Sequence, residues 1–213
     1  MSNGEKTYTR REEFLNAVTH YAGAAAVIAG IFFLFSKPRA TDSPVAWAAS
    51  LFYAASLFFM FAVSGFYHSV CEVRLRKIAR QLDHSAIYFL ITGTYAPLLY
   101  LVSPDRVGVV IFSILAVLSV TGTAGRFFDI AGFRKIEIAL YIIMGWCCVA
   151  IAGKLISNLP PLSLWLLLAG GISYTAGVAV YLKRREFFHA IWHLFVLCGA
   201  GLQFFAVTAA MDL

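Results

Sequence analysis

Three of the five histidines in this 213-residue chain occur in a pattern that predicts metal binding. His189 and His193 are four residues apart, so on a helix they lie one turn apart on the same face. His68 lies in a separate apolar stretch. Imidazole is a favoured ligand of zinc, and three histidines with an open fourth position form a ligand set used in catalytic zinc sites. We therefore expect His68, His189 and His193 to hold a zinc ion.

Two further polar residues are candidates for the same site. Ser64 lies one helical turn before His68, and Asp83 stands at the start of the third apolar stretch. We expect Asp83 to act as a general base, or to hold water or a ligand imidazole, and Ser64 to position water or an oxyanion. Considered singly, Ser64 is better explained as a small packing residue and Asp83 as a helix N-cap. Their assignment depends on the histidines.

The remaining histidines, His20 and His84, are interpreted as interfacial residues near the ends of membrane helices. His84 directly follows Asp83, so its ring could still turn toward the same pocket. For His189 and His193, hydrogen bonding to neighbouring helices is the alternative to metal binding.

Apolar residues make up 61% of the chain, and the mean hydropathy is +0.79. A membrane-spanning helix needs about 20 mainly apolar residues. The composition and spacing predict an all-α integral membrane protein, a seven-transmembrane helix bundle forming a single domain over residues 1–213, with residues 1–13 as a short cytoplasmic segment. The apolar stretches are residues 14–36, 43–71, 84–104, 107–125, 138–153, 155–182 with its helix starting after Pro160 and Pro161, and 187–211.

The distribution of basic residues predicts the orientation of this bundle, because cytoplasmic loops are enriched in Lys and Arg. Thirteen of the 17 basic residues precede the first stretch or follow the second, fourth and sixth. We therefore expect the N-terminus inside and the C-terminus outside, with all five candidate site residues in one layer near the cytoplasmic face. The surplus charge of +6 is divided among short loops, which argues against a nucleic-acid partner. The four basic residues in the other connections are Lys37, Arg39, Arg106 and Lys154.

Three motifs contain the candidate site residues: Ser64-Gly65-Phe66-Tyr67-His68, Leu82-Asp83-His84-Ser85-Ala86-Ile87-Tyr88 and His189-Ala190-Ile191-Trp192-His193. These motifs resemble those of the hemolysin III proteins and their relatives, the progestin and adipoQ receptors, which include the adiponectin receptors. The resemblance implies zinc held by His68, His189 and His193, water held by Asp83, and Ser64 nearby. It also implies an inside N-terminus and kinship with membrane hydrolases such as the alkaline ceramidases, which cleave a lipid amide or ester.

The short form, without a long N-terminal cytoplasmic region, resembles bacterial members and argues against receptor-type signalling. We expect a multi-pass protein of the bacterial inner (plasma) membrane whose partner is a membrane lipid, as substrate or as ligand. A zinc-dependent hydrolase acting near the cytoplasmic leaflet is the first hypothesis. A non-enzymatic sensor or regulator of membrane lipid state, with structural zinc, is the alternative. A pore is less consistent, because the ionisable candidates lie at one face. The lipid and the oligomeric state stay open.

The predicted orientation can be tested with reporter fusions. Alkaline phosphatase, which is active only after export, should be active when fused after residue 213 and inactive when fused after residue 132, in the loop after the fourth stretch. A fluorescent protein fused after residue 132 should fluoresce, because that loop is expected to lie in the cytoplasm. The reverse pattern of phosphatase activity would contradict the orientation and the assignment of the candidate site to the cytoplasmic side.

Overall fold

The computed structural model describes residues 8–183 and 185–212, and this part of the chain is helical and contains no strand. Seven helical segments in it are long and apolar enough to cross a membrane, which confirms the predicted fold class. The elements are α1 (Arg10–Phe35), η1 (Pro38–Ala40), α2 (Pro44–Ser69), α3 (Val73–Val102), α4 (Arg106–Phe127), a fifth span of α5 (Phe133–Gly145), η2 (Trp146–Ile151) and α6 (Ala152–Asn158), then α7 (Pro161–Tyr181) and α8 (Phe188–Ala210).

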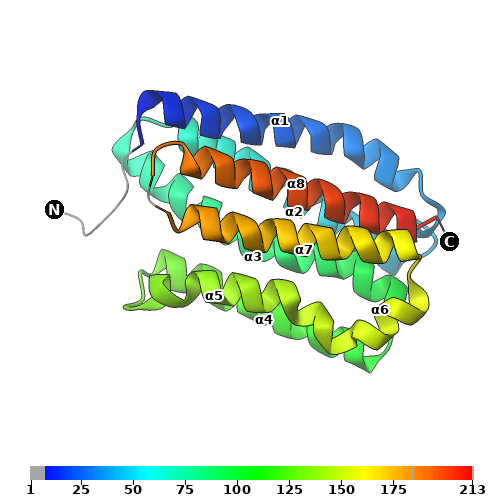
Figure 1. Cartoon of the computed structure of the whole chain (residues 1–213). Coiled ribbons are helices and arrows are strands. Elements are labelled where there is room, and N and C mark those ends of the chain that lie inside the picture. Colours follow the sequence, from blue (N-terminus) through cyan, green and yellow to red (C-terminus); the bar gives the residue numbers. More distant parts are fainter. Residues whose placement is uncertain (1–7, 184, 213) are drawn as a thin grey trace.

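The helices lie side by side in a bundle (Figure 1). Helix α1 packs against α2 and α8, α2 packs against α3, α3 against α4, and α7 against α8. Segments far apart in sequence are therefore neighbours. The start of α1, the end of α2 and the start of α8 lie at the same end of the bundle (Figure 1). This arrangement places the first and last helices around the C-terminal turn of α2, which carries His68.

Helix α3 begins earlier than predicted. Glu72 caps it by accepting hydrogen bonds from the backbone N–H groups of Arg74 and Leu75 at 2.8 and 2.6 Å. Asp83 therefore lies ten residues, or about 15 Å, inside the helix. The predicted N-cap role of Asp83 is wrong. Arg, Lys and Gln in residues 73–82 are good helix formers, although their polar side chains exclude them from an apolar stretch.

Helix α1 also begins earlier, at Arg10, so residues 10–13 of the predicted N-terminal segment are helical. Residues 1–7 of that segment lie outside the described part. Thr9 and Glu12 form a capping box, in which each side chain accepts a hydrogen bond from the other's backbone N–H. Glu13 is thereby fixed in the first turn of a helix. The fifth span is likewise longer than the predicted residues 138–153 and is interrupted by the 3-10 turn η2.

Close packing of α3 on α2 depends on Gly93. A Cβ atom at this position would lie 2.1 Å from the Ser56 hydroxyl oxygen and 2.8 Å from its Cβ. Because side chains on α2 already fill this contact, no larger residue fits without moving one helix. The glycine thus sets the separation between the helix that carries His68 and the helix that carries Asp83.

We expect Gly93→Ala to lower the free energy of unfolding by about 1–2 kcal/mol, because overpacking outweighs the helix propensity that alanine adds. Gly153→Ala is the matched control, since a Cβ there would meet nothing within 4 Å. Denaturant unfolding of the detergent-solubilised protein, followed by tryptophan fluorescence, measures both. Equal stability of the two variants would contradict the close approach.

Candidate metal centre

The three predicted ligands converge at one end of the bundle. His68 comes from the last turn of α2, and His189 and His193 come from the first two turns of α8. One ring nitrogen from each lies within 4.8 Å of the others, and His68 Nε2 is 3.2 Å from His189 Nε2. His68 and His193 are buried, whereas His189 is half-buried. The structure therefore brings together three histidines that are separated by up to 125 positions in the sequence.

The spacing of these nitrogens fits a tetrahedral ion such as zinc. With zinc–nitrogen bonds of about 2.0–2.1 Å, two ligand nitrogens are about 3.4 Å apart. The Nε2 atoms of His68 and His189 are already near this separation, and one ring nitrogen from each of the three histidines lies within 4.8 Å of the others. The donor set, three imidazoles, is also one that zinc accepts. The residues present therefore fit the metal that the sequence predicts.

Helix α1 supplies the hydrogen-bond partners of two ligands. His68 Nδ1 lies 2.6 Å from a Glu13 carboxylate oxygen. His193 Nδ1 lies 3.1 Å from the backbone carbonyl oxygen of Asn16 and 3.2 Å from the Thr19 hydroxyl. Metal-binding histidines usually donate their second N–H to a carboxylate or a carbonyl in this way, which leaves the other nitrogen for the ion.

The contribution of α1 to the site was not predicted from the sequence. The available signal was the spacing of Glu13, Asn16 and Thr19, which follow one another at three-residue intervals at the start of the first apolar stretch. Residues three apart are neighbours on a helix surface. Polar residues that share a face of a membrane helix indicate contact with other polar groups inside the bundle.

Ser64 and Asp83 are placed less decisively. Ser64 is buried on α2, one turn before His68 and on the same face. Asp83 is half-buried within α3. Apart from the contact between His68 and His189, the hydrogen bonds that the described part of the chain makes to His68 and His193 come from α1 and not from these two residues. The roles of Asp83 and Ser64 stay predictions.

His20 is buried, with 3% of its surface exposed, so its interpretation as an interfacial residue is wrong. Its ring stacks on that of His193, with centroids 3.6 Å apart. Both ring nitrogens of His20 are buried without a hydrogen-bond partner among the described residues. The packing of α1 on α8 turns this face of α1 inward, and neither helix alone encodes that contact. His20 supports the ring of a ligand but is outside the three-nitrogen cluster.

His84 belongs to a different polar network. Its Nδ1 atom lies 3.5 Å from Glu137, which also accepts a hydrogen bond from Arg126 at 3.1 Å. The Tyr141 hydroxyl donates to the backbone carbonyl of His84 at 2.8 Å. These contacts join α3, α4 and α5. The imidazole of His84 is thus engaged with Glu137, and it does not join the three-nitrogen cluster.

Aromatic rings surround the cluster. The ring centroid of Tyr8, just before α1, lies 4.8 Å from that of His189 and 5.9 Å from that of His68. The ring centroids of Tyr67 and His68 are 4.5 Å apart, and those of Tyr181 and His189 are 5.7 Å apart. Burial raises the pKa of the Tyr8 phenol, so it keeps its proton at neutral pH. A protonated phenol beside the imidazoles is a hydrogen-bond donor as well as an apolar cover.

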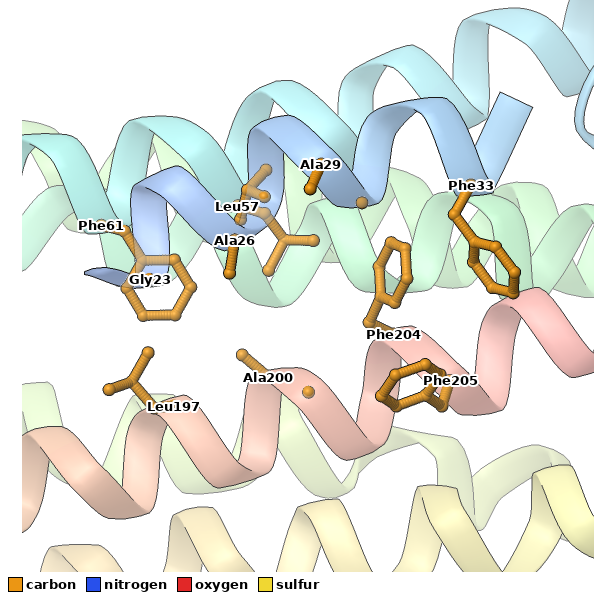
Figure 2. A pocket seen from close by; sticks show the side chains of 13 residues that line it. Gly23, Ala26, Ala29, Phe33, Leu57, Phe61, Leu197, Ala200, Phe204 and Phe205 are labelled. Atoms are coloured by element: carbon orange, nitrogen blue, oxygen red, sulfur yellow. The ribbon is translucent and has the colours of Figure 1, made fainter. Parts of the chain in front are cut away.

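An apolar groove of about 390 Å³ runs between α1 and α8 (Figure 2). One end is formed by Gly23, Phe61 and Leu197, and the other reaches Phe204 and Phe33. The end formed by Gly23, Phe61 and Leu197, called the near end below, is the one closer to the histidine cluster. Gly23 is three residues after His20, Leu197 is four after His193, and Phe61 makes an edge contact with the His20 ring at 5.3 Å. The groove therefore begins about one helical turn from the cluster.

A second apolar cavity, of about 290 Å³, lies among α3, the fifth span, α7 and α8. Trp192, which is next to His193 in sequence, lines it together with Tyr95, Tyr174 and Gly171. The two spaces lie on different sides of α8. Each is large enough to hold part of a small ligand.

Known proteins are similar to this chain over regions that include the three motifs. The family model described as "Haemolysin-III related" matches residues 8–204, which include the whole histidine cluster. The chain is 37% identical over 198 residues to Hemolysin-3 of Bacillus cereus, covering 92% of this chain and 90% of that protein. Identity to the Hemolysin-3 homolog of Bacillus subtilis (strain 168) is 33% over 203 residues, or 94% of each chain.

Similarity also extends to an animal protein. Human monocyte to macrophage differentiation factor is 27% identical over 213 residues, covering 97% of this chain and 87% of the human one. The resemblance predicted from three short motifs is thus confirmed over nearly the full length of the bundle. This chain is a multi-pass membrane protein that belongs to the haemolysin-III-related family.

Proposed function

We propose that this protein is a zinc-dependent hydrolase that cleaves an amide or ester bond of a lipid near the cytoplasmic leaflet of a bacterial inner membrane. One observation carries the proposal: three imidazole nitrogens from two helices lie within 4.8 Å of one another. The donor set leaves a fourth position for substrate or water, as in catalytic zinc sites. The resemblance to membrane hydrolases favours hydrolysis among the reactions that such a site supports.

Each candidate residue has a role in this reaction. Zinc, when bound by the three histidines, supplies a Lewis acid that polarises a carbonyl and lowers the pKa of water. Asp83 takes a proton from the water that attacks the carbonyl carbon and returns it to the leaving amine or alcohol as the C–N or C–O bond breaks. The Ser64 hydroxyl donates a hydrogen bond to the oxyanion that develops on the carbonyl oxygen.

A lipid substrate is favoured by the groove between α1 and α8. The lining of the groove is apolar, and the groove lies between two membrane-spanning helices. Its near end is about one helical turn from His193. An acyl chain in the groove would place the adjoining amide or ester beside the histidine cluster. The small residues Ala200 and Gly201 of α8 line the groove, and a Cβ at Gly201 would meet nothing within 4 Å, so there is open space between the helices at this point.

A sensor with structural zinc is the second candidate. It is favoured by the way in which the cluster and its hydrogen bonds tie α1, α2 and α8 together. Both candidates use the same three ligands. They differ in Asp83, which the hydrolase needs for proton transfer and the sensor does not.

Metal content tests the site first. Purified wild-type protein should contain about one zinc ion per chain, and His68→Ala and His193→Ala should each retain less than about a tenth of that, because a site with two ligands loses most of its affinity. His84→Ala removes a histidine outside the cluster and should keep the metal. Elemental analysis by mass spectrometry gives these values, and unchanged zinc in both ligand variants would remove the proposed site.

In the same set of proteins, Asp83→Asn should keep its zinc but lose fatty-acid release from a broad panel of lipid amides and esters by at least about a hundredfold, the usual effect of losing a general base. Undiminished turnover in Asp83→Asn would overturn the assigned base. A zinc-loaded wild-type protein that hydrolyses no lipid in the panel would favour the sensor.

The groove can be tested by filling it. Gly201 lines the groove and a Cβ there meets nothing within 4 Å, so the side chain of Gly201→Leu should occupy the groove and abolish hydrolysis of long-chain substrates while leaving zinc content unchanged. Gly171→Leu fills the second cavity instead, and Gly153→Leu points into open space. Rates on long-chain and short-chain substrates compare the three variants. Loss of long-chain activity in Gly171→Leu alone would move the acyl chain to the other cavity.

A further inference from the structure

A pair of charged residues outside the three ligands is joined to His68. Glu13 of α1 contacts the His68 ring through one carboxylate oxygen and the guanidinium of Arg76 on α3 through the other. The Glu13 and Arg76 side chains are 17% and 30% exposed, whereas the His68 side chain is fully buried. The pair thus connects a buried imidazole to the edge of the bundle.

The contact with Glu13 selects one tautomer of His68. A carboxylate can only accept a hydrogen bond, and the Glu13 oxygen at 2.6 Å is much closer to the Nδ1 atom of His68 than the amide nitrogen of Asn16 at 3.4 Å, so Nδ1 carries the ring hydrogen. The lone pair is then on Nε2, the atom that faces His189 Nε2 at 3.2 Å. The other neutral tautomer would place a hydrogen where the ion must bind.

Arg76 holds the carboxylate in this position. Its guanidinium donates to the backbone carbonyl of Val70 at 2.9 Å, just beyond the last turn of α2, and lies 4.9 Å above the Tyr67 ring. This hydrogen bond comes from Nη1 of Arg76, and the other terminal nitrogen, Nη2, contacts the Glu13 carboxylate. The planar fork of arginine can satisfy a carbonyl and a carboxylate at the same time, which the ammonium of lysine does less well. Arg76 is therefore fixed to the helix that carries His68 and fixes Glu13 relative to it.

We propose that Glu13 and Arg76 are positioning residues for the metal centre, which set the tautomer and the orientation of the His68 ring before the metal binds. The inference rests on the proposed metal site but not on hydrolysis. Outer hydrogen-bond partners of metal-binding histidines contribute about 10–100-fold to metal affinity. A pair that only braced α1 against α2 and α3 would contribute to stability and leave affinity unchanged.

The experiment measures zinc affinity of the full-length protein in detergent by competition with a chromophoric chelator. Glu13→Ala, which removes the acceptor, should weaken zinc binding 10–100-fold. Glu13→Gln keeps the shape and an acceptor oxygen but loses the charge, so a smaller loss is expected. Arg76→Ala should also weaken binding, since the carboxylate loses its support. Glu72→Gln removes a carboxylate that caps α3 through backbone hydrogen bonds only, and it should bind zinc like wild type.

Thermal unfolding of the metal-free proteins separates positioning from bracing. Weaker zinc binding in Glu13→Gln, with metal-free unfolding within about 2 °C of wild type, would support the proposal even if Glu13→Ala does not fold. Unchanged zinc affinity in a destabilised Glu13 variant would overturn it and leave the metal site intact. Absence of zinc binding by the wild-type protein would instead overturn the proposed site itself, so the two failures can be told apart.

Discussion

Burying an imidazole nitrogen without a hydrogen-bond partner inside a membrane bundle costs free energy, because no bulk water is available to replace the partner. The histidine cluster depends on the partners that α1 supplies. Glu13 binds Nδ1 of His68, and the Asn16 carbonyl with the Thr19 hydroxyl binds Nδ1 of His193. The second nitrogens of these rings then face the centre of the cluster. Without α1 in this position, the same histidines could form hydrogen bonds to neighbouring helices and would not be oriented for an ion.

Helix α1 changes character along its length, and this change connects the site to the apolar groove. Its first three turns carry polar groups that contact the histidines, ending with His20 stacked on His193. From Gly23 onward, the same side of the helix is small and apolar and lines the groove opposite α8 (Figure 2). A polar centre continuous with an apolar groove matches an amphipathic lipid, whose reactive bond lies between a polar head and an acyl chain.

The sequence predicts the seven spans because length and hydropathy alone decide whether a helix can cross a membrane. It misplaces the start of α3 and the start of α1, since charged residues that continue a helix beyond the apolar layer resemble a loop. Glu13 and Arg76 illustrate the consequence. Both lie outside the predicted apolar stretches, although the structure joins them to His68.

The sequence predicts the three histidines of the cluster but not the residues of α1 that surround them. The spacing of His189 and His193 follows from helix geometry, and the orientation deduced from basic loops placed His68 at a similar depth. Which face of α1 turns inward depends on the packing of α1 against α8, so the burial of His20 could not be read from its own neighbours in sequence. The positions of Asp83 and Ser64 relative to a substrate likewise depend on a ligand.

X-ray absorption spectroscopy at the zinc edge of the purified wild-type protein identifies the ligands of the bound ion. We expect a first shell that includes three imidazole nitrogens at about 2.0–2.1 Å, with the outer-shell scattering typical of histidine rings. A first shell of oxygen or sulfur ligands without imidazole, or a protein that takes up no zinc when it is supplied, would contradict this expectation.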